Sequence, residues 1–154
     1  KEMIASAKVI LKRMASFGKP IDIKFTAIDD RQVDLEKLRG KVVLVDFWAT
    51  WCGPCVQALP GVKATYEKFH PKGFEIVGVN LDLNKETVGP YLEKNKIRWP
   101  QIYESGGLDS PPARSFGIIS LPTMFLVDAE GKVTNRNATV VDVKNLLSET
   151  YEKK

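Results

Sequence analysis

Two cysteines are the residues of this 154-residue chain best suited to covalent chemistry. Cys52 and Cys55 stand three positions apart in the segment FWATWCGPC. A structural zinc site takes about four nitrogen or sulfur ligands, whereas the chain offers a single histidine, His70, beside the pair. A purely structural disulfide across so short a loop would add only modest stability, because it removes little entropy from the unfolded chain. Reversible redox chemistry is the third use of such a pair.

The segments on either side of the cysteines favour the redox interpretation. Residues 41–48 (KVVLVDFW) are apolar and β-branched, as in a central strand covered on both faces, and a helix is predicted from the cysteines to about residue 69. Cys52 is therefore expected at the helix N-terminus, where unpaired N–H groups and the helix dipole stabilise a thiolate. Cys55 follows nearly one turn later, within reach of a disulfide and more sheltered, and Pro54 stiffens the loop between them. An exposed nucleophilic thiol beside a sheltered resolving thiol is what thiol–disulfide exchange requires.

The remaining hydrophobic pattern alternates between strands and helices. Further strands are predicted over residues 21–28, 74–81, 123–128 and 132–136, and a short turn over 35–38. Helices are predicted over residues 2–17, 84–96 with a break at Gly89-Pro90, 110–117 and 141–154. This alternation predicts an α/β fold with a β-hairpin at the end of the sheet.

The composition is that of an ordinary globular chain. The 23 Lys and Arg residues outnumber the 19 Asp and Glu residues slightly, and the signs are interspersed. We interpret this balance as a solvated, lysine-rich surface, and no nucleic-acid partner is expected. The longest apolar run, residues 42–45, is too short to span a membrane. The chain begins with Lys1 and shows no signal peptide, so we expect a targeting segment or membrane anchor upstream of it.

Two motifs resemble the thioredoxin superfamily. The segment VDFWATWCGPC, followed by Pro60, resembles thioredoxin, and Leu121-Pro122-Thr123 before an apolar strand resembles the second signature of these proteins. The resemblance implies that the Leu121–Pro122 bond is cis and faces the cysteine pair; X-Pro is the common setting of cis peptides. It covers about residues 18–152, and residues 1–17 are expected to be the tail of an upstream domain or a tether.

Within the superfamily the chain is similar to the extracytoplasmic reductases of the bacterial TlpA and ResA type. The lead-in GKPIDIKFTAIDDRQVDLEKLRGKVVLVDFWATWC resembles their N-terminal extension. GFEIVGVNLD and IRWPQIYE resemble the insertion that they carry before the cis-proline, and LPTMFLVDAEGKV resembles their closing hairpin. Three departures concern partner specificity: Asp46 stands where asparagine is common, Ala58 where glutamate is common, and residues 136–138 lack a usual glycine.

The resemblance implies a thioredoxin fold, a central mixed β-sheet flanked by helices, over residues 18–154. It implies a thiol–disulfide oxidoreductase that reduces protein disulfides through Cys52 and Cys55 and needs no metal or organic cofactor. The partners would be disulfide-bearing protein substrates and an upstream reductant protein, and the chain is expected to act as a monomer outside the cytoplasm. Two alternatives stay open: a non-catalytic binding module of the same fold, and a peroxiredoxin-like thiol peroxidase.

Asp46 interrupts a strand that is otherwise built for burial. Alternation places it on one face with Val42, Leu44 and Trp48. It could be a strand-end residue that reaches solvent. The alternative is a partly buried carboxyl beneath Cys55, with a raised pKa, that assists deprotonation of the resolving thiol. The match to thioredoxin's aspartate favours the second interpretation.

The other candidate site residues surround the cysteines. Trp51 is expected to flank the nucleophile at the surface and to contact substrate, together with Gly53, Pro54, Leu121 and Pro122. Two further residues are expected to have structural roles: Trp48 in packing beside the motif, and His70 as a helix cap or surface residue.

Overall fold

A five-stranded sheet forms the centre of the computed structural model, which describes residues 21–152. The strand order is β5-β4-β3-β6-β7. The strands are β3 (Val43–Trp48), β4 (Glu75–Asn80), β5 (Gln101–Tyr103), β6 (Thr123–Val127) and β7 (Val133–Asn135). β3 is parallel to β4 and antiparallel to β6, and β7 closes the sheet as the second strand of a hairpin with β6. The predicted mixed sheet and its terminal hairpin are confirmed.

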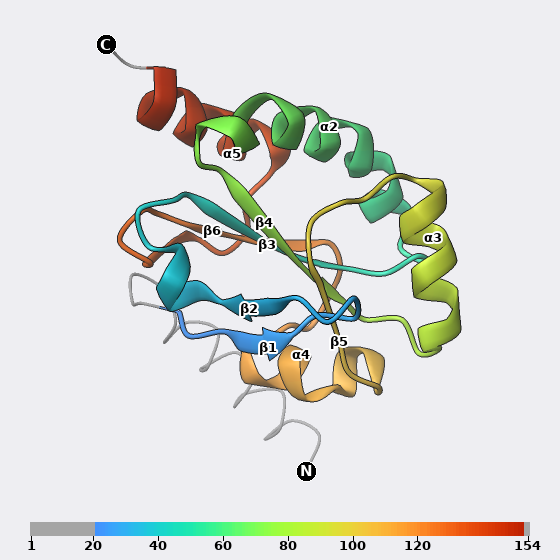
Figure 1. Cartoon of the computed structure of the whole chain (residues 1–154). Helices are drawn as coiled ribbons and strands as arrows, with labels where there is room; N and C mark the ends of the chain where they lie inside the picture. Colours follow the sequence, from blue (N-terminus) through green and yellow to red (C-terminus); the bar gives the residue numbers. More distant parts are fainter. Residues whose placement is uncertain (1–20, 153–154) are drawn as a thin grey trace.

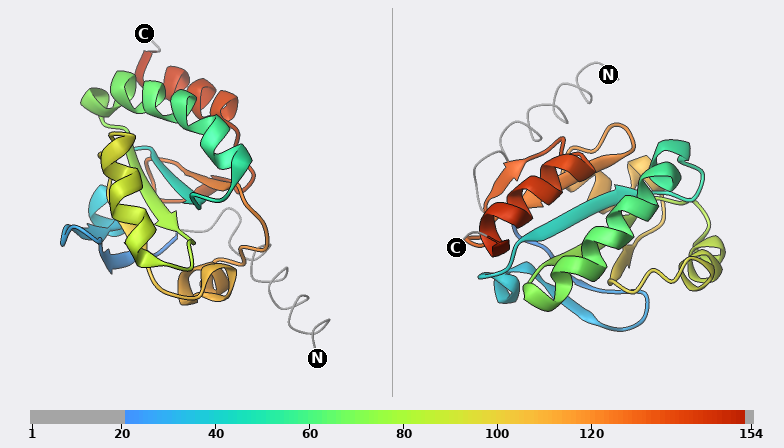
Figure 2. Two further views of the ribbon diagram at one scale, coloured as in Figure 1. Left: turned by 90° about the vertical axis from the view of Figure 1, so that its right-hand side faces the viewer. Right: turned by 90° about the horizontal axis from the view of Figure 1, so that it is seen from above.

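Helices cover both faces of this sheet (Figures 1 and 2). On one face lie α2 (Gly53–Phe69) and α5 (Val140–Leu147), and on the other lie α4 (Pro111–Ser115) and a small hairpin of β1 (Lys24–Thr26) and β2 (Gln32–Asp34). α3 (Val88–Lys94) stands at the side of the sheet. Short helical turns complete the chain: η1 (Leu35–Leu38), η2 (His70–Lys72), η3 (Lys85–Thr87), η4 (Gly107–Asp109) and the π-helical η5 (Ser148–Glu152).

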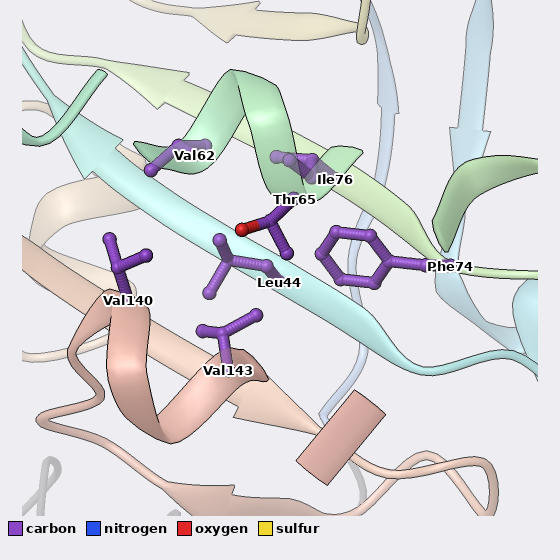
Figure 3. Close-up of a pocket in the computed structure, with 7 residues that line it drawn as sticks. All are labelled: Leu44, Val62, Thr65, Phe74, Ile76, Val140 and Val143. Carbon is purple, nitrogen blue, oxygen red and sulfur yellow. The ribbon is translucent and has the colours of Figure 1, made fainter. Parts of the chain in front are cut away.

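Alternation along β3 divides the interior into two hydrophobic cores. Val43, Val45 and Phe47 face the core beneath the β1–β2 hairpin and α4. Leu44 points the other way, into the core under α2 and α5. Figure 3 shows side chains of α2 and α5 converging on Leu44 from both sides. Burial on both faces explains why residues 41–48 lack the apolar–polar alternation of a half-exposed strand.

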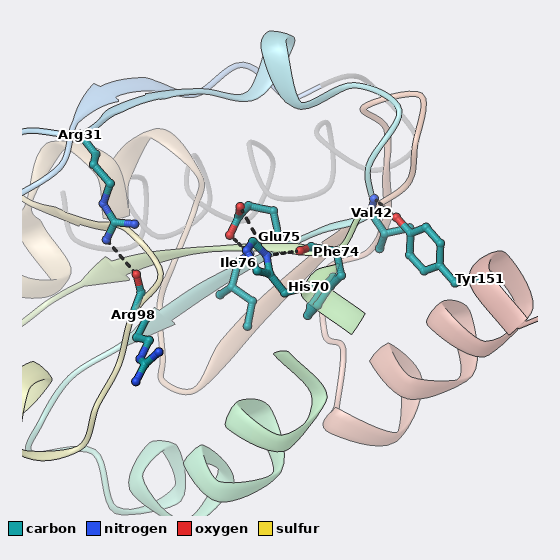
Figure 4. A network of polar contacts seen from close by, with 8 residues as sticks. All are labelled: Arg31, Val42, His70, Phe74, Glu75, Ile76, Arg98 and Tyr151. Carbon is teal, nitrogen blue, oxygen red and sulfur yellow. Dashed lines mark hydrogen bonds and ion pairs between the residues drawn. The ribbon is translucent and has the colours of Figure 1, made fainter. Parts of the chain in front are cut away.

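Polar contacts fix the ends of several elements (Figure 4). The hydroxyl of Tyr151 accepts a hydrogen bond from the backbone N–H of Val42 at 3.1 Å, which ties the end of the chain to the start of β3. His70 is the C-cap of α2, and its Nδ1 donates to the carbonyl of Phe74 at 2.9 Å. The predicted capping role of His70 is therefore confirmed.

Several predicted elements differ from the structure. The strand predicted over residues 21–28 is regular only over residues 24–26, and the three-residue strands β2 and β5 were not predicted. The predicted break at Gly89-Pro90 is wrong, because both residues lie in the first turn of α3, where the missing N–H of a proline breaks no helical hydrogen bond. The final helix ends at Leu147 and continues as η5. The helix predicted over residues 2–17, and with it the proposed division of the chain there, lies outside the described residues.

Candidate redox site

The cysteine pair lies where β3 passes into α2. A disulfide joins Cys52 to Cys55, whose Cα atoms are 5.2 Å apart. Cys52 is the N-cap of α2, and its Sγ accepts a hydrogen bond from the backbone N–H of Cys55 at 3.2 Å. Pro54 occupies the first turn, where it interrupts no helical hydrogen bond. The predicted position of Cys52 at the helix N-terminus is confirmed, and a thiolate there would face unpaired N–H groups.

The predicted difference in exposure between the two cysteines is wrong for this disulfide form. Cys52 is 4% exposed and Cys55 is 8% exposed, so both are buried. They form one small cluster with Trp48 and Ala49, and Leu121 packs against it. The neighbouring side chains thus shelter both sulfurs while they are bonded. The two cysteines differ instead in their positions in α2: Cys52 is the N-cap, and Cys55 lies within the first turn.

The Leu121–Pro122 peptide bond is cis, as predicted. Leu121 is partly buried against the cysteine cluster, whereas Pro122 is exposed. The hydroxyl of Thr123 donates to the carbonyl of Ser120 at 2.8 Å and holds the turn that leads into β6. The structure therefore brings together the two sequence motifs, which are distant in the chain.

Trp51 and the two residues between the cysteines are exposed, and their contact with substrate remains a prediction. Trp51 is 58% exposed directly before Cys52, and Gly53 and Pro54 are exposed after it. Trp48, by contrast, is buried, and its ring packs on that of Tyr91 with centroids 5.4 Å apart. The predicted packing role of Trp48 is confirmed.

Asp46 lies inside the protein beneath the second cysteine. Its side chain lines a narrow pocket together with Cys55, Tyr91 and Gln101. Asp46 is 8% exposed, and burial raises its pKa to about 7 from an ordinary value of 3.8. Desolvation has this effect because it disfavours the charged carboxylate. The interpretation of Asp46 as a strand-end residue that reaches solvent is therefore excluded, and the predicted burial and raised pKa are confirmed.

A buried aspartate that we did not predict holds the loop before the cysteines. Asp82, in the segment after β4, accepts hydrogen bonds from the backbone N–H of Thr50 at 3.0 Å and from the Thr50 hydroxyl at 2.6 Å. Asn80 donates to the same carboxylate through Nδ2 at 2.7 Å. The sequence carried only part of the signal for this contact: Asp82 follows the strand predicted over residues 74–81, and the structure shows that this strand is the parallel neighbour of β3.

Gln101 is the second site residue that the sequence did not reveal. It opens β5, and its Oε1 accepts a hydrogen bond from the indole Nε1 of Trp48 at 2.8 Å. Gln101 is one of three polar or charged residues in the segment IRWPQIYE, and β5 is only three residues long, so no local pattern singled it out.

The described residues contain neither a candidate metal cluster nor a helix able to cross a membrane. Within residues 21–152, no group of three or more His, Cys, Asp and Glu side chains is arranged to hold a metal ion. Among the helices of the same range, none has both the length and the apolar character needed to cross a membrane.

The fold and the disulfide at the start of α2 define a thioredoxin-fold protein with a disulfide across a Cys-X-X-Cys motif. Comparison with known families gives a match to the Redoxin family over residues 17–152. The chain belongs to the Redoxin family.

Individual relatives narrow the resemblance within that family. The thiol-disulfide oxidoreductase ResA of Bacillus thuringiensis subsp. konkukian is 32% identical over 108 residues, which are 70% of this chain and 61% of the length of that protein. ResA of Bacillus subtilis is 31% identical over 123 residues, 76% of this chain and 67% of its own length. The thioredoxin domain of a thiol-disulfide oxidoreductase from Bacteroides vulgatus superposes with a TM-score of 0.74 at 31% identity, covering 88% of this chain and 97% of that structure. The predicted thioredoxin fold and the resemblance to the TlpA and ResA type are confirmed.

Proposed function

We propose that this protein reduces disulfide bonds in other proteins by dithiol exchange through Cys52 and Cys55. The observation that carries the proposal is the disulfide between these residues at the N-terminus of α2. A bond closed by two cysteines in one helical turn can open and reform without rearranging the sheet. The names of the ResA relatives, which describe thiol–disulfide oxidoreductases, support the same chemistry.

The proposed reaction has two exchange steps. The Cys52 thiolate attacks one sulfur of a substrate disulfide; that bond breaks, a bond from Cys52 to the substrate forms, and the second substrate sulfur leaves and takes up a proton. Cys55 then loses its proton and attacks the Cys52 sulfur, which breaks the mixed disulfide and leaves the Cys52–Cys55 bond. Two electrons pass to the substrate, and a reductant protein restores the dithiol.

Asp46 is the proposed base of the second step. A thiol in an apolar setting parts with its proton reluctantly, and Cys55 lines the same pocket as the Asp46 carboxyl. A pKa of about 7 places Asp46 near half ionisation at neutral pH, so that it can both accept a proton and release it again. General-base catalysis is most efficient when the pKa of the base lies near the working pH.

The proposed substrate surface surrounds Cys52. Trp51, Gly53, Pro54 and Pro122 are exposed there, and Leu121 lies partly exposed between them and the cysteine cluster. We infer that a substrate segment lies across these residues while its disulfide reaches Cys52. We further propose that the chain works as a monomer outside the cytoplasm, where disulfide-bearing proteins are found.

Reduction of insulin by dithiothreitol tests the proposal. The protein should accelerate insulin reduction, and Cys52→Ser should abolish the acceleration because the attacking sulfur is gone. Circular dichroism of Cys52→Ser, compared with that of the reduced wild-type protein, checks that the variant is folded. Turnover that survives Cys52→Ser would overturn the assignment of the nucleophile. A wild-type protein that neither cycles between dithiol and disulfide nor accelerates insulin reduction would instead be a binding module.

A further inference from the structure

The side-chain amide of Gln101 is buried with one end paired and the other end free. Gln101 is 2% exposed, and its Oε1 accepts the hydrogen bond from Trp48. The indole N–H can only donate, so the carbonyl side of the amide must face Trp48 and the NH₂ side must point away from it. Nε2 is fully buried and has no hydrogen-bond partner among the residues that the structure describes. A buried donor of this kind is rare and calls for a partner.

The amide of Gln101 has room in the interior because Gly78 has no side chain. Asp46, Gly78 and Gln101 stand in register on the neighbouring strands β3, β4 and β5. A Cβ on Gly78 would overlap all three terminal atoms of the Gln101 side chain. The amide therefore lies over the backbone of β4, one strand spacing of about 4.8 Å from the strand that carries Asp46.

Gln101 lines the pocket that Asp46 and Cys55 share, and its NH₂ group is the end of the amide that Trp48 leaves free. Gln101, Asp46 and Cys55 all line this pocket, and about 10 Å³ within it is open to the centre of a water molecule. That space fits about one water. Such a water would have the Gln101 amide as donor, the Asp46 carboxylate as acceptor and the Cys55 sulfur as third neighbour, which meets the need of a buried water for two to four polar partners.

We propose that Gln101 is a positioning residue of the redox site, whose NH₂ group holds one water molecule between Asp46 and Cys55. This inference rests on the proposed function, because the water matters when Cys55 gives up its proton. In that step the Cys55 thiol passes its proton to the water, and the water passes one of its own to the Asp46 carboxylate. The resulting Cys55 thiolate then attacks the mixed disulfide, as described above. Trp48 contributes indirectly, because it fixes which end of the amide faces the pocket.

Tyr91 is the other titratable group that lines this pocket, and it does not titrate in the same pH range as Asp46. Tyr91 of α3 lines the same pocket, and burial, with a smaller contribution from the Asp82 carboxylate, raises the pKa of its phenol. Tyr91 therefore stays neutral through the pH range in which Asp46 titrates. Changes in the titration of Asp46 can be assigned to its own surroundings.

Gln101→Met tests the proposal, because it keeps the length of the side chain and removes the amide. A donor that stabilises the carboxylate lowers the pKa of Asp46, so its loss should raise that pKa by about one unit. Carboxyl ¹³C NMR on the disulfide form measures this directly and requires no turnover. The resolution of a mixed disulfide, followed by stopped-flow, should slow about fivefold at pH 7, because the ionised fraction of Asp46 falls from about one half to about one tenth. The rate should recover above pH 9.

Gly78→Ala is a second variant that displaces the amide of Gln101 while Gln101 itself is unchanged. The added methyl group displaces the flexible end of the side chain, so the pKa of Asp46 should rise in this variant as well. Gln32→Met, on the exposed strand β2, is the matched control and should change neither readout. An Asp46 titration that is unchanged in both Gln101→Met and Gly78→Ala would overturn the inference, even if both variants were less stable. If the wild-type protein failed to reduce disulfides, the NMR titration would still decide the role of Gln101.

Discussion

The buried carboxyl of Asp46 makes the stability of this protein depend on pH. Burial raises its pKa to about 7, while its ordinary value, which applies to the unfolded chain, is 3.8. Between these two values the folded state holds a proton that the unfolded state has lost. The contribution of Asp46 to stability is therefore greatest below about pH 4, falls as the pH rises towards 7, and levels off above that value.

Asp46→Asn should remove this dependence, because the amide does not ionise. At pH 8 the free energy of unfolding should rise by up to roughly 4 kcal/mol, since a difference of about three pKa units is worth 1.36 kcal/mol each. Urea denaturation of the disulfide form at pH values from 4 to 8 measures the effect. Asp22→Asn, at an exposed site, should leave the profile of the wild-type protein unchanged. Parallel profiles for the wild-type and Asp46→Asn proteins would show that Asp46 does not titrate as its burial implies.

The same variant should be impaired in catalysis while it gains stability. Asp46→Asn preserves the shape of the side chain but cannot accept the proton of Cys55, and positioned bases contribute about 10²–10⁴-fold to proton transfer. The mixed disulfide should therefore live longer at neutral pH and resolve faster in alkali, where hydroxide replaces the base. Opposite effects on stability and rate would separate a functional aspartate from a structural one.

At the scale of residues, the sequence was most informative where the site residues are close together along the chain. Cys52, Cys55 and Asp46 lie within one strand–helix junction, so local spacing placed the cysteines at the start of the helix, and the match to thioredoxin's aspartate favoured the burial of Asp46. Gln101 and Asp82 reach the site only because β4 lies beside β3 and β5 lies beside β4. No local pattern encodes that pairing, and a polar residue in a three-residue strand resembles any loop residue.

Elements are held in register by a few polar contacts at their ends. Tyr151 of η5 lies far from β3 in sequence, yet its hydroxyl accepts the hydrogen bond from the N–H of Val42 (Figure 4). Its ring packs near that of Phe69 at the end of α2, with centroids 6.5 Å apart. The side chain of Tyr151 thus connects η5 with the start of β3 and with the end of α2.

Tyr151→Phe isolates the hydroxyl from the ring. The variant retains the packing but leaves the N–H of Val42, a residue only 1% exposed, without its partner. An unsatisfied buried donor costs about 1–3 kcal/mol, and thermal or urea unfolding should show a loss in that range. Tyr103→Phe is the matched control, because its hydroxyl donates to the carbonyl of Leu83 at an exposed site, and it should cost less. Equal losses in the two variants would mean that the Val42 contact adds nothing specific.

The long elements of the fold were predictable because their hydrophobic patterns are long. β3 and β4 appear in the sequence as nearly continuous apolar runs, and α2 is a helix of 17 residues. β1, β2 and β5 have three residues each, and their strand character comes from pairing with neighbours rather than from composition. The break predicted at Gly89-Pro90 failed for a related reason: a proline disrupts a helix only beyond its first turn, and the start of α3 could not be located from the pattern alone.

At the scale of the whole molecule, the redox site lies at one end of a sheet that is packed on both faces. The residues of the two cores surround β3 along its length, while the cysteine cluster forms a third, smaller group where the strand ends. Opening the disulfide therefore changes bonding at the edge of the fold and leaves both cores in place. A protein built in this way can form a covalent bond with a second protein and release it while remaining folded.

Cys55→Ser should trap that covalent complex, because the protein itself can no longer resolve it. The Cys52 thiolate can still attack a substrate disulfide, but no second thiol remains to displace the product, so the mixed disulfide accumulates. We expect an adduct of one chain with one substrate molecule, detected by mass spectrometry and released by dithiothreitol. Cys52→Ser is the matched control: it keeps one thiol, at Cys55, and should trap little. Adducts of equal yield from the two variants would reverse or abolish the assigned roles of the cysteines, and trapped proteins that all belong to the cytoplasm would contradict the proposed location.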